Sequence, residues 1–107
     1  MIQSDRSQPV FRALADPTRR AIISMLANGG RPIAEIAAEF DMTRPAVAKH
    51  LAILREGGLI AVEPKGRERI NRLNPAALKT AADWINHFDQ FWDDRLAKLK
   101  QVVEDKS

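Results

Sequence analysis

Hydrophobic residues recur every three or four positions along most of the chain, which predicts a mainly helical protein. The expected helices cover residues 8–15, 17–28, 33–40, 44–56 and 75–104. Asp16-Pro17 supplies an N-cap and a first-turn proline for the second helix, which Gly29-Gly30 ends. Thr43 is a similar N-cap for the fourth helix, which Gly57-Gly58 ends. A short turn therefore joins the third helix to a fourth helix with a defined start.

The pattern changes after the fourth helix. Residues 59–62, Leu-Ile-Ala-Val, form the apolar and branched run typical of a strand. Residues 63–68 have the glycine and the charges of an exposed turn, and residues 69–73 are expected to return as a second strand. Two helices joined by a short turn and followed by a hairpin predict a winged helix-turn-helix. The fold class is mainly α with a small β-hairpin, about five helices plus a two-stranded wing, and the 107 residues fit one domain, 1–107.

Positive charge is concentrated in the middle of the chain. Residues 44–72 hold seven basic and three acidic side chains, whereas residues 75–107 hold five and six. A local basic excess is the electrostatic signature of a nucleic-acid contact, although a solvated face could look similar. Within the fourth helix, Val47, Leu51 and Leu54 lie on one side while Pro45 and Lys49 point the opposite way. The helix can therefore pack on its domain and still enter a major groove about 12 Å wide.

These positions predict a set of DNA contacts. They are Thr43, Arg44, Pro45, Ala46, Ala48, Lys49 and His50 in the fourth helix, with Lys65, Arg67 and Arg69 in the wing. His50 borders the apolar face, so it either packs there or donates to a phosphate. Arg19 and Arg20 could also touch the DNA backbone, but a solvated helix face explains them better.

The last helix carries two adjoining apolar stripes, which together form an arc of roughly 140°. One contains Leu78, Ile85, Trp92, Leu96, Leu99 and Val103, and the other contains Trp84, Phe88, Phe91 and Val102. So wide an arc favours contact with both the protein's own domain and a second subunit, the alternative being one thick intramolecular core. The predicted dimer interface is Val10, Phe11, Leu14, Trp84, Phe88, Phe91, Trp92 and Arg95. Arg95 would pair with an aspartate across this interface or reach solvent.

Other chemistry has little support in the sequence. The absence of cysteine excludes disulfides and thiolate metal sites and favours a reducing compartment, the cytoplasm. The sequence contains no apolar run of about 20 residues, so no membrane span is predicted. With two histidines and no glycine-rich phosphate loop, the sequence predicts no enzyme and no cofactor. Asp83 and His87 are four residues apart, and Asp94 is nearby, but too few ligands accompany them, so no metal site is predicted.

Three motifs resemble one family. From Pro9 to Leu99 the chain is similar to the ArsR/SmtB family of winged-helix repressors through FRALADPTRRAII, DMTRPAVAKHLAILREGGLI and GRERINRLNP. The resemblance implies that helices two to four and the hairpin bind DNA and that the first and last helices form a dimer. The run WINHFDQFWDDRLAKL resembles a subgroup without metal-binding cysteines. Two positions depart from the family pattern: Ala48 stands where serine is common, and Asn71 where tyrosine is common.

The sequence thus predicts a homodimeric repressor, cytoplasmic and nucleoid-associated, that binds a palindromic operator in double-stranded DNA at its own or a neighbouring promoter. The alternative is a dimeric protein-interaction module of the same fold that binds DNA only weakly and without sequence preference. Operator binding at moderate salt distinguishes the two.

Overall fold

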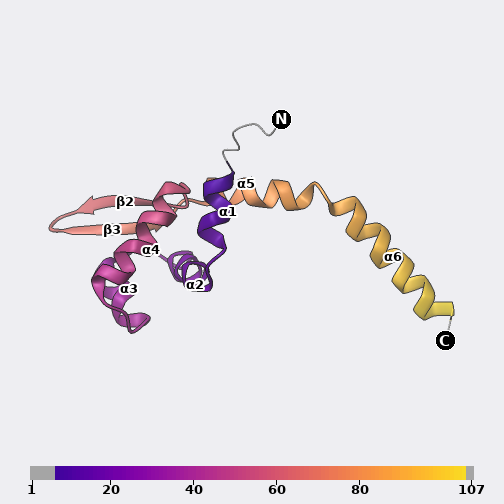
Figure 1. The fold of residues 1–107 in the computed structure, drawn as a ribbon, viewed down its shortest axis with the longest axis horizontal. Helices are drawn as coiled ribbons and strands as arrows, with labels where there is room; N and C mark the ends of the chain where they lie inside the picture. The colour runs from indigo at the N-terminus through magenta and orange to yellow at the C-terminus, as the bar shows by residue number, and fades with distance from the viewer. Residues whose placement is uncertain (1–6, 106–107) are drawn as a thin grey trace.

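A computed structural model describes residues 7–105 and contains six helices and three strands within that range (Figure 1). In chain order the elements are α1 Gln8–Leu14, α2 Pro17–Leu26, β1 Arg31–Pro32, α3 Ile33–Glu39, α4 Arg44–Glu56, β2 Ile60–Lys65, β3 Glu68–Leu73, α5 Pro75–Asn86 and α6 Asp89–Asp105. The mainly helical fold with a hairpin wing is confirmed, and α3 and α4 form the helix-turn-helix.

Local signals explain where the central helices begin. The side chain of Asp16 accepts a hydrogen bond from the backbone N–H of Arg19 at 3.0 Å, and the hydroxyl of Thr43 accepts one from Ala46 at 3.3 Å. Each bond satisfies an N–H that has no partner in the first turn of a helix. Pro17 and Pro45 lie in these first turns, where the missing N–H has no cost.

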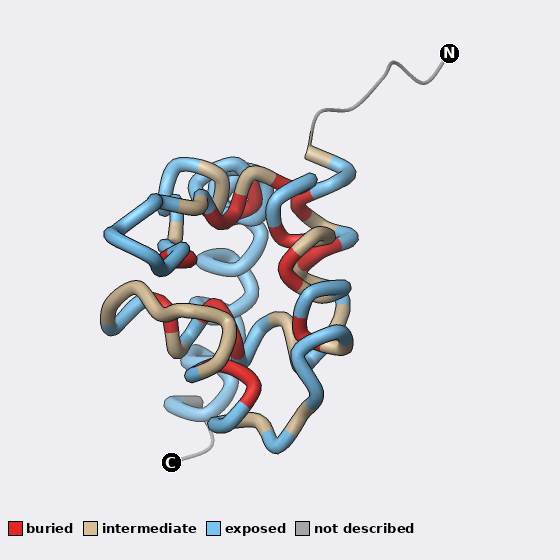
Figure 2. Tube along the Cα trace, turned by 90° about the vertical axis from the view of Figure 1, so that its left-hand side faces the viewer, coloured by how far each residue is buried: buried red, intermediate tan, exposed pale blue. Residues whose placement is uncertain are grey.

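The core lies between α1, α2, α3, α4 and the start of β2. Its largest fully buried side chains are Ile22, Ile36, Val47, Leu54 and Leu59. Figure 2 shows the buried segments of these elements turned toward one another, whereas the trace that leads to the C-terminus is exposed. The predicted inner face of α4 is confirmed, because Val47, Leu51 and Leu54 are all buried.

The three strands form one antiparallel sheet in the order β1-β3-β2. The wing is longer and tighter than predicted: β2 and β3 pair from Ile60 opposite Leu73 to Lys65 opposite Glu68, so only Gly66 and Arg67 form the turn. Gly66 has φ 63°, which a residue without a side chain adopts readily. The short β1 was not predicted. It pairs with the base of β3, where the buried side chain of Asn71 donates to the carbonyl oxygen of Arg31 at 3.2 Å.

The predicted last helix is interrupted, and this is why the structure has six helices rather than about five. It turns at His87 and Phe88, and α6 starts at Asp89, a favourable residue for a helix N-terminus. The first part of α5 packs on the core through Ala81, but α6 extends away from the body (Figure 1). All residues from Asp89 to Glu104 are exposed. The alternative of one thick intramolecular core is therefore wrong for α6.

Within residues 7–105, no helix combines the length and the apolar character that crossing a membrane requires.

Candidate nucleic-acid interface

The outer face of α4 presents small and basic side chains. Of the α4 positions predicted to contact DNA, Thr43, Arg44, Pro45, Ala48 and Lys49 are exposed, and the remaining two, at positions 46 and 50, are half-buried. Small side chains at the outer surface permit a close approach to a groove floor, and the two cations can reach phosphates or base edges.

Basic side chains on the body have partners within the chain, whereas most of those on α4 and the wing do not. On the body, Arg12 pairs with Glu56 at 3.3 Å, and Lys79 with Asp83 at 3.0 Å. Arg31 on β1 is also paired, with Glu35, and within the wing Arg72 is paired with Glu63. Six cations on α4 and the wing have no side-chain hydrogen bond or ion pair with any residue in the range 7–105; they are Arg44, Lys49, Arg55, Lys65, Arg67 and Arg69. The exposed positive charge of α4 and the wing is therefore available to an anionic partner.

Arg19 does not lie on a solvated face, so that expectation was wrong. Its Nε donates to the carbonyl oxygen of Ala13 at 2.8 Å, and its Nη2 donates to that of Arg12 at 3.0 Å. Both carbonyls are at the end of α1, where cations are favoured by the helix dipole. Arg20 binds the same helix end, because its Nη1 donates to the carbonyl oxygen of Leu14 at 2.8 Å.

The guanidinium of Arg19 also reaches α4, which is the recognition helix of the helix-turn-helix. Nη1 of Arg19 lies 3.3 Å from Nδ1 of His50. A guanidinium can only donate hydrogen bonds, so Nδ1 is the acceptor and the hydrogen of the neutral ring is on Nε2. His50 thus contacts the protein through one ring nitrogen, and Nε2–H remains as a donor. Through Arg19, α1 is tied to α4 by contacts that span 31 positions of the sequence.

The acid–base properties of this junction follow from its geometry. The backbone N–H of Arg19, followed by the positive charge of Arg19, lowers the pKa of the Asp16 carboxyl below its ordinary value of 3.8, although burial opposes this shift. Asp16 is therefore ionised at neutral pH, where its carboxylate caps α2.

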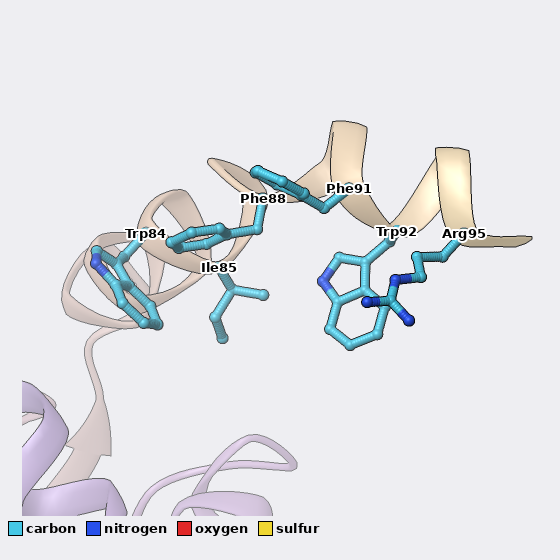
Figure 3. Close-up of a pocket in the computed structure, with 6 residues that line it drawn as sticks. All are labelled: Trp84, Ile85, Phe88, Phe91, Trp92 and Arg95. Carbon is cyan, nitrogen blue, oxygen red and sulfur yellow. The ribbon is translucent and has the colours of Figure 1, made fainter.

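A second surface runs along α5 and α6. Trp84, Ile85, Phe88, Phe91, Trp92 and Arg95 line a groove of about 670 Å³, which we call the aromatic groove (Figure 3). Its rings touch in sequence: Trp84 and Phe88 have centroids 5.1 Å apart, and Phe88 and Phe91 6.1 Å apart. Trp84 is 57% exposed, Phe91 68% and Trp92 61%. Such a contiguous apolar surface is typical of an interface with another molecule.

The first helix contributes less to this surface than predicted. Val10 is only 4% exposed and belongs to the core of its own chain, which disagrees with its predicted place at a dimer interface. Phe11 and Leu14 are half-buried against the same core. Phe11 still borders the aromatic groove, because its ring lies 5.5 Å from that of Trp84.

Two of the three residues considered as metal ligands, Asp83 and His87, have other contacts. The carboxylate of Asp83 accepts hydrogen bonds from Lys79, and the ring of His87 packs edge-on against Phe88 at 5.2 Å. In the range 7–105 no three histidine, aspartate or glutamate side chains are grouped so that they could hold a metal ion.

A helix-turn-helix whose second helix is exposed and basic, followed by a basic hairpin, defines a winged helix-turn-helix DNA-binding protein. A helix-turn-helix domain family matches residues 14–63. The transcriptional regulator Rv2034 of Mycobacterium tuberculosis is 37% identical over 88% of this chain and 85% of its own. The transcriptional repressor SdpR of Bacillus subtilis is 33% identical over 81% and 97%.

Solved structures agree with these relatives. An ArsR-like transcriptional regulator from Rhodococcus sp. RHA1 superposes with a TM-score of 0.76 at 34% identity, covering 94% of this chain and 92% of that one. The homodimeric winged helix-turn-helix DNA-binding domain of a possible ArsR-family regulator from Mycobacterium bovis has a TM-score of 0.66 at 26% identity, over 84% and 91%. The chain belongs to the ArsR/SmtB family of transcriptional regulators. Its relatives are DNA-binding regulators rather than enzymes.

Proposed function

We propose that the protein is a homodimeric transcriptional repressor that binds a palindromic operator in double-stranded DNA, at its own or a neighbouring promoter. The observation that carries this proposal is the clustering of unpaired cations: six on α4 and the wing have no side-chain partner in the range 7–105, whereas the basic side chains on the body do. Phosphates are the partners that an exposed, unpaired basic helix fits best. Repression follows when the dimer occupies DNA that the transcription machinery needs.

In this proposal the first turns of α4 enter the major groove and the wing tip reaches the adjacent minor groove. Lys49 and Arg44 provide the charged contacts of α4, and small neighbours let its backbone come close. The contacts proposed are Thr43, Arg44, Pro45, Ala46, Ala48, Lys49 and Nε2–H of His50 in α4, with Lys65, Arg67 and Arg69 in the wing.

The second subunit covers the aromatic groove and the rest of α6. Support comes from the large exposed apolar side chains between Trp84 and Val103, which no other part of residues 7–105 covers. A homodimeric relative of the same fold supports the same arrangement. Two-fold symmetry would place two recognition helices about 34 Å apart, one helical turn of DNA, which is why the operator should be a palindrome.

Selection of random duplexes against the purified protein, followed by titration of the recovered site at several salt concentrations, tests the DNA-binding part of this proposal. Lys49→Ala should weaken binding and, where Lys49 touches a base, relax selectivity at one position. Arg67→Ala should weaken binding to all sequences and reduce the slope of log K against log salt by about 1. Lys79→Ala is the matched control, because Lys79 lies on α5 and is paired with Asp83.

The outcomes of this experiment distinguish a repressor from a protein-interaction module. A recovered palindrome whose affinity depends on Lys49 and Arg67, but not on Lys79, supports the repressor. Weak binding without a recovered site, unchanged in both variants, would instead favour a protein-interaction module of the same fold. A reporter promoter that contains the recovered site then tests repression: the wild-type protein should lower transcription, and Lys49→Ala should restore it.

A further inference from the structure

A second groove separates α4 from the wing, and two arginines face it. Its volume is about 200 Å³, and it is lined by Ile33 of α3, by Ala48, Leu51 and Arg55 of α4, and by Val62, Arg69 and Asn71 of the hairpin. We call it the interstrand groove. None of the residues that line it is acidic. Arg55 and Arg69 are both exposed, and neither side chain has a hydrogen bond or an ion pair with another residue in the range 7–105.

The two faces of the hairpin differ in whether their arginines are paired with a carboxylate. Arg69 pairs across the sheet with Pro64, and Asn71 with Val62, so these residues share the face that lines the interstrand groove. On the opposite face Arg72 is neutralised by Glu63. On α4 the neighbouring carboxylate of Glu56 is likewise used, by Arg12 of α1. The paired charges of Arg72, Glu63 and Glu56 therefore lie outside the groove, whereas the unpaired Arg55 and Arg69 line it.

The groove is also held in shape. Asn71 at its base is buried and donates to the carbonyl oxygen of Arg31, so the side chain is fixed and cannot turn outward without losing that bond. Ala48 on the α4 side is exposed and has only a methyl group, which leaves the passage open. Arg44 occupies the same edge of α4, eleven residues before Arg55, and so lies about 16 Å from it along the helix axis.

The geometry of DNA indicates what the interstrand groove binds. A major groove and the adjacent minor groove are separated by one sugar–phosphate strand, so a helix in the first and a wing in the second must have that strand between them. We infer that the interstrand groove is a phosphodiester-binding site that holds this strand, with Arg55 and Arg69 donating to one phosphate from opposite sides. The inference rests on the proposed function and adds Arg55 to the DNA-binding surface.

Guanidinium groups suit this role because each can donate two parallel hydrogen bonds to phosphate oxygens. A strand in this groove also explains the small side chain at position 48. A long side chain at position 48 would project into the passage between the two arginines, so the small residue is what lets the strand enter. Without the strand, nothing in the range 7–105 compensates the two charges.

The test uses the full-length protein and the duplex recovered by selection. Arg55→Gln and Arg69→Gln should each weaken binding about tenfold at moderate salt and reduce the salt slope by about 1. Lys79→Gln is the charge-matched control and should change neither quantity. Ala48→Leu should weaken binding as well, although it removes no charge, because it narrows the passage. Thermal unfolding of each variant checks that the fold is retained.

A set of duplexes, each with one neutral methylphosphonate, then locates the phosphate. In the wild type, neutralising the phosphate that lies between the major-groove and minor-groove contacts should weaken binding about as much as Arg55→Gln does. Combining that duplex with Arg55→Gln should cause little further loss, because both changes remove the same interaction. Arg67→Ala combined with the same duplex should instead give additive losses.

Two results would overturn the inference, and they are distinguishable from failure of the proposed function. If Lys49→Ala and Arg67→Ala weaken binding while Arg55→Gln and Arg69→Gln do not, the protein binds DNA but no strand lies in the interstrand groove. If the losses from Arg55→Gln and from every methylphosphonate are additive, Arg55 acts by general charge and not at a site. If none of the α4 and wing variants changes binding, the proposed function itself fails.

Discussion

Replacing Phe91 by aspartate should dissociate the proposed dimer. Phe91 is the most exposed of the large hydrophobic side chains that line the aromatic groove, at 68%. It lies on α6, which extends away from the body, so its substitution leaves the core of the protomer unchanged (Figure 1). A charge introduced there would be desolvated without a partner if a second subunit covers the groove.

The exposed fraction of Phe91 gives the size of the expected loss of dimer stability. A phenylalanine surface of about 200 Å² that is 68% exposed leaves about 130 Å² for a partner to cover, which is worth about 3 kcal/mol at 25 cal/mol per Å². Symmetry places Phe91 at the interface twice, so its loss costs about 6 kcal/mol per dimer and should weaken self-association about 10⁴-fold. Operator affinity should also fall strongly, because one subunit loses the gain from joining two half-sites.

Sedimentation of the wild type and Phe91→Asp at micromolar concentration, paired with operator titration, measures both effects. Gln90→Asp is the matched control: it introduces the same charge at the neighbouring position of α6, outside the aromatic groove. A variant that remains dimeric would refute the assignment of this groove to the interface. A wild-type protein that is monomeric yet binds a palindrome tightly would refute the dimer itself.

Three further predictions concern the N-caps of α4 and α2 and the link between Arg19 and His50. Thr43→Ala should lower the free energy of unfolding by about 1 kcal/mol through loss of the α4 cap, and Thr43→Ser should restore most of it in denaturant titrations. Arg19→Met should reduce operator affinity more than Arg20→Met, because only Arg19 also contacts His50; equal losses, measured by titration, would mean that the link to α4 has no role. The lowered pKa of Asp16, caused first by the Arg19 backbone N–H, stabilises the fold above pH 3.8, and this stability is lost as the pH falls below that value. Asp16→Asn keeps the cap but removes the charge, so its unfolding midpoint should depend less on pH in that acid range; a dependence equal to that of the wild type would contradict this.

Local patterns were enough to predict most helices. The apolar spacing of Val47, Leu51 and Leu54, the cap at Thr43 and the terminal glycines all act within a few residues, so they can be recognised without knowing the rest of the fold. The order of helix, turn, helix and hairpin followed from them, as did the basic outer face of α4. The family resemblance agreed with this order because its motifs cover the same segments.

The features missed in the sequence depend on residues that are far apart in it. The two-residue strand β1 exists because Arg31 and Pro32 lie opposite Asn71 and Ile70, about 40 positions away, and a run so short has no periodicity. The break at His87 has neither glycine nor proline to mark it. Its consequence is large, since it separates the α5 residues that pack on the core from the exposed α6.

The arrangement of charges also needed the tertiary structure. Arg19 and Arg69 are both surface arginines in the sequence, but folding brings one to the carbonyls that end α1 and leaves the other facing a groove without a carboxylate. Helix periodicity is a property of neighbouring residues and can be recognised in the chain itself. Whether a charge is compensated depends on which distant groups come within a few ångströms of it, and chain packing alone determines that distance.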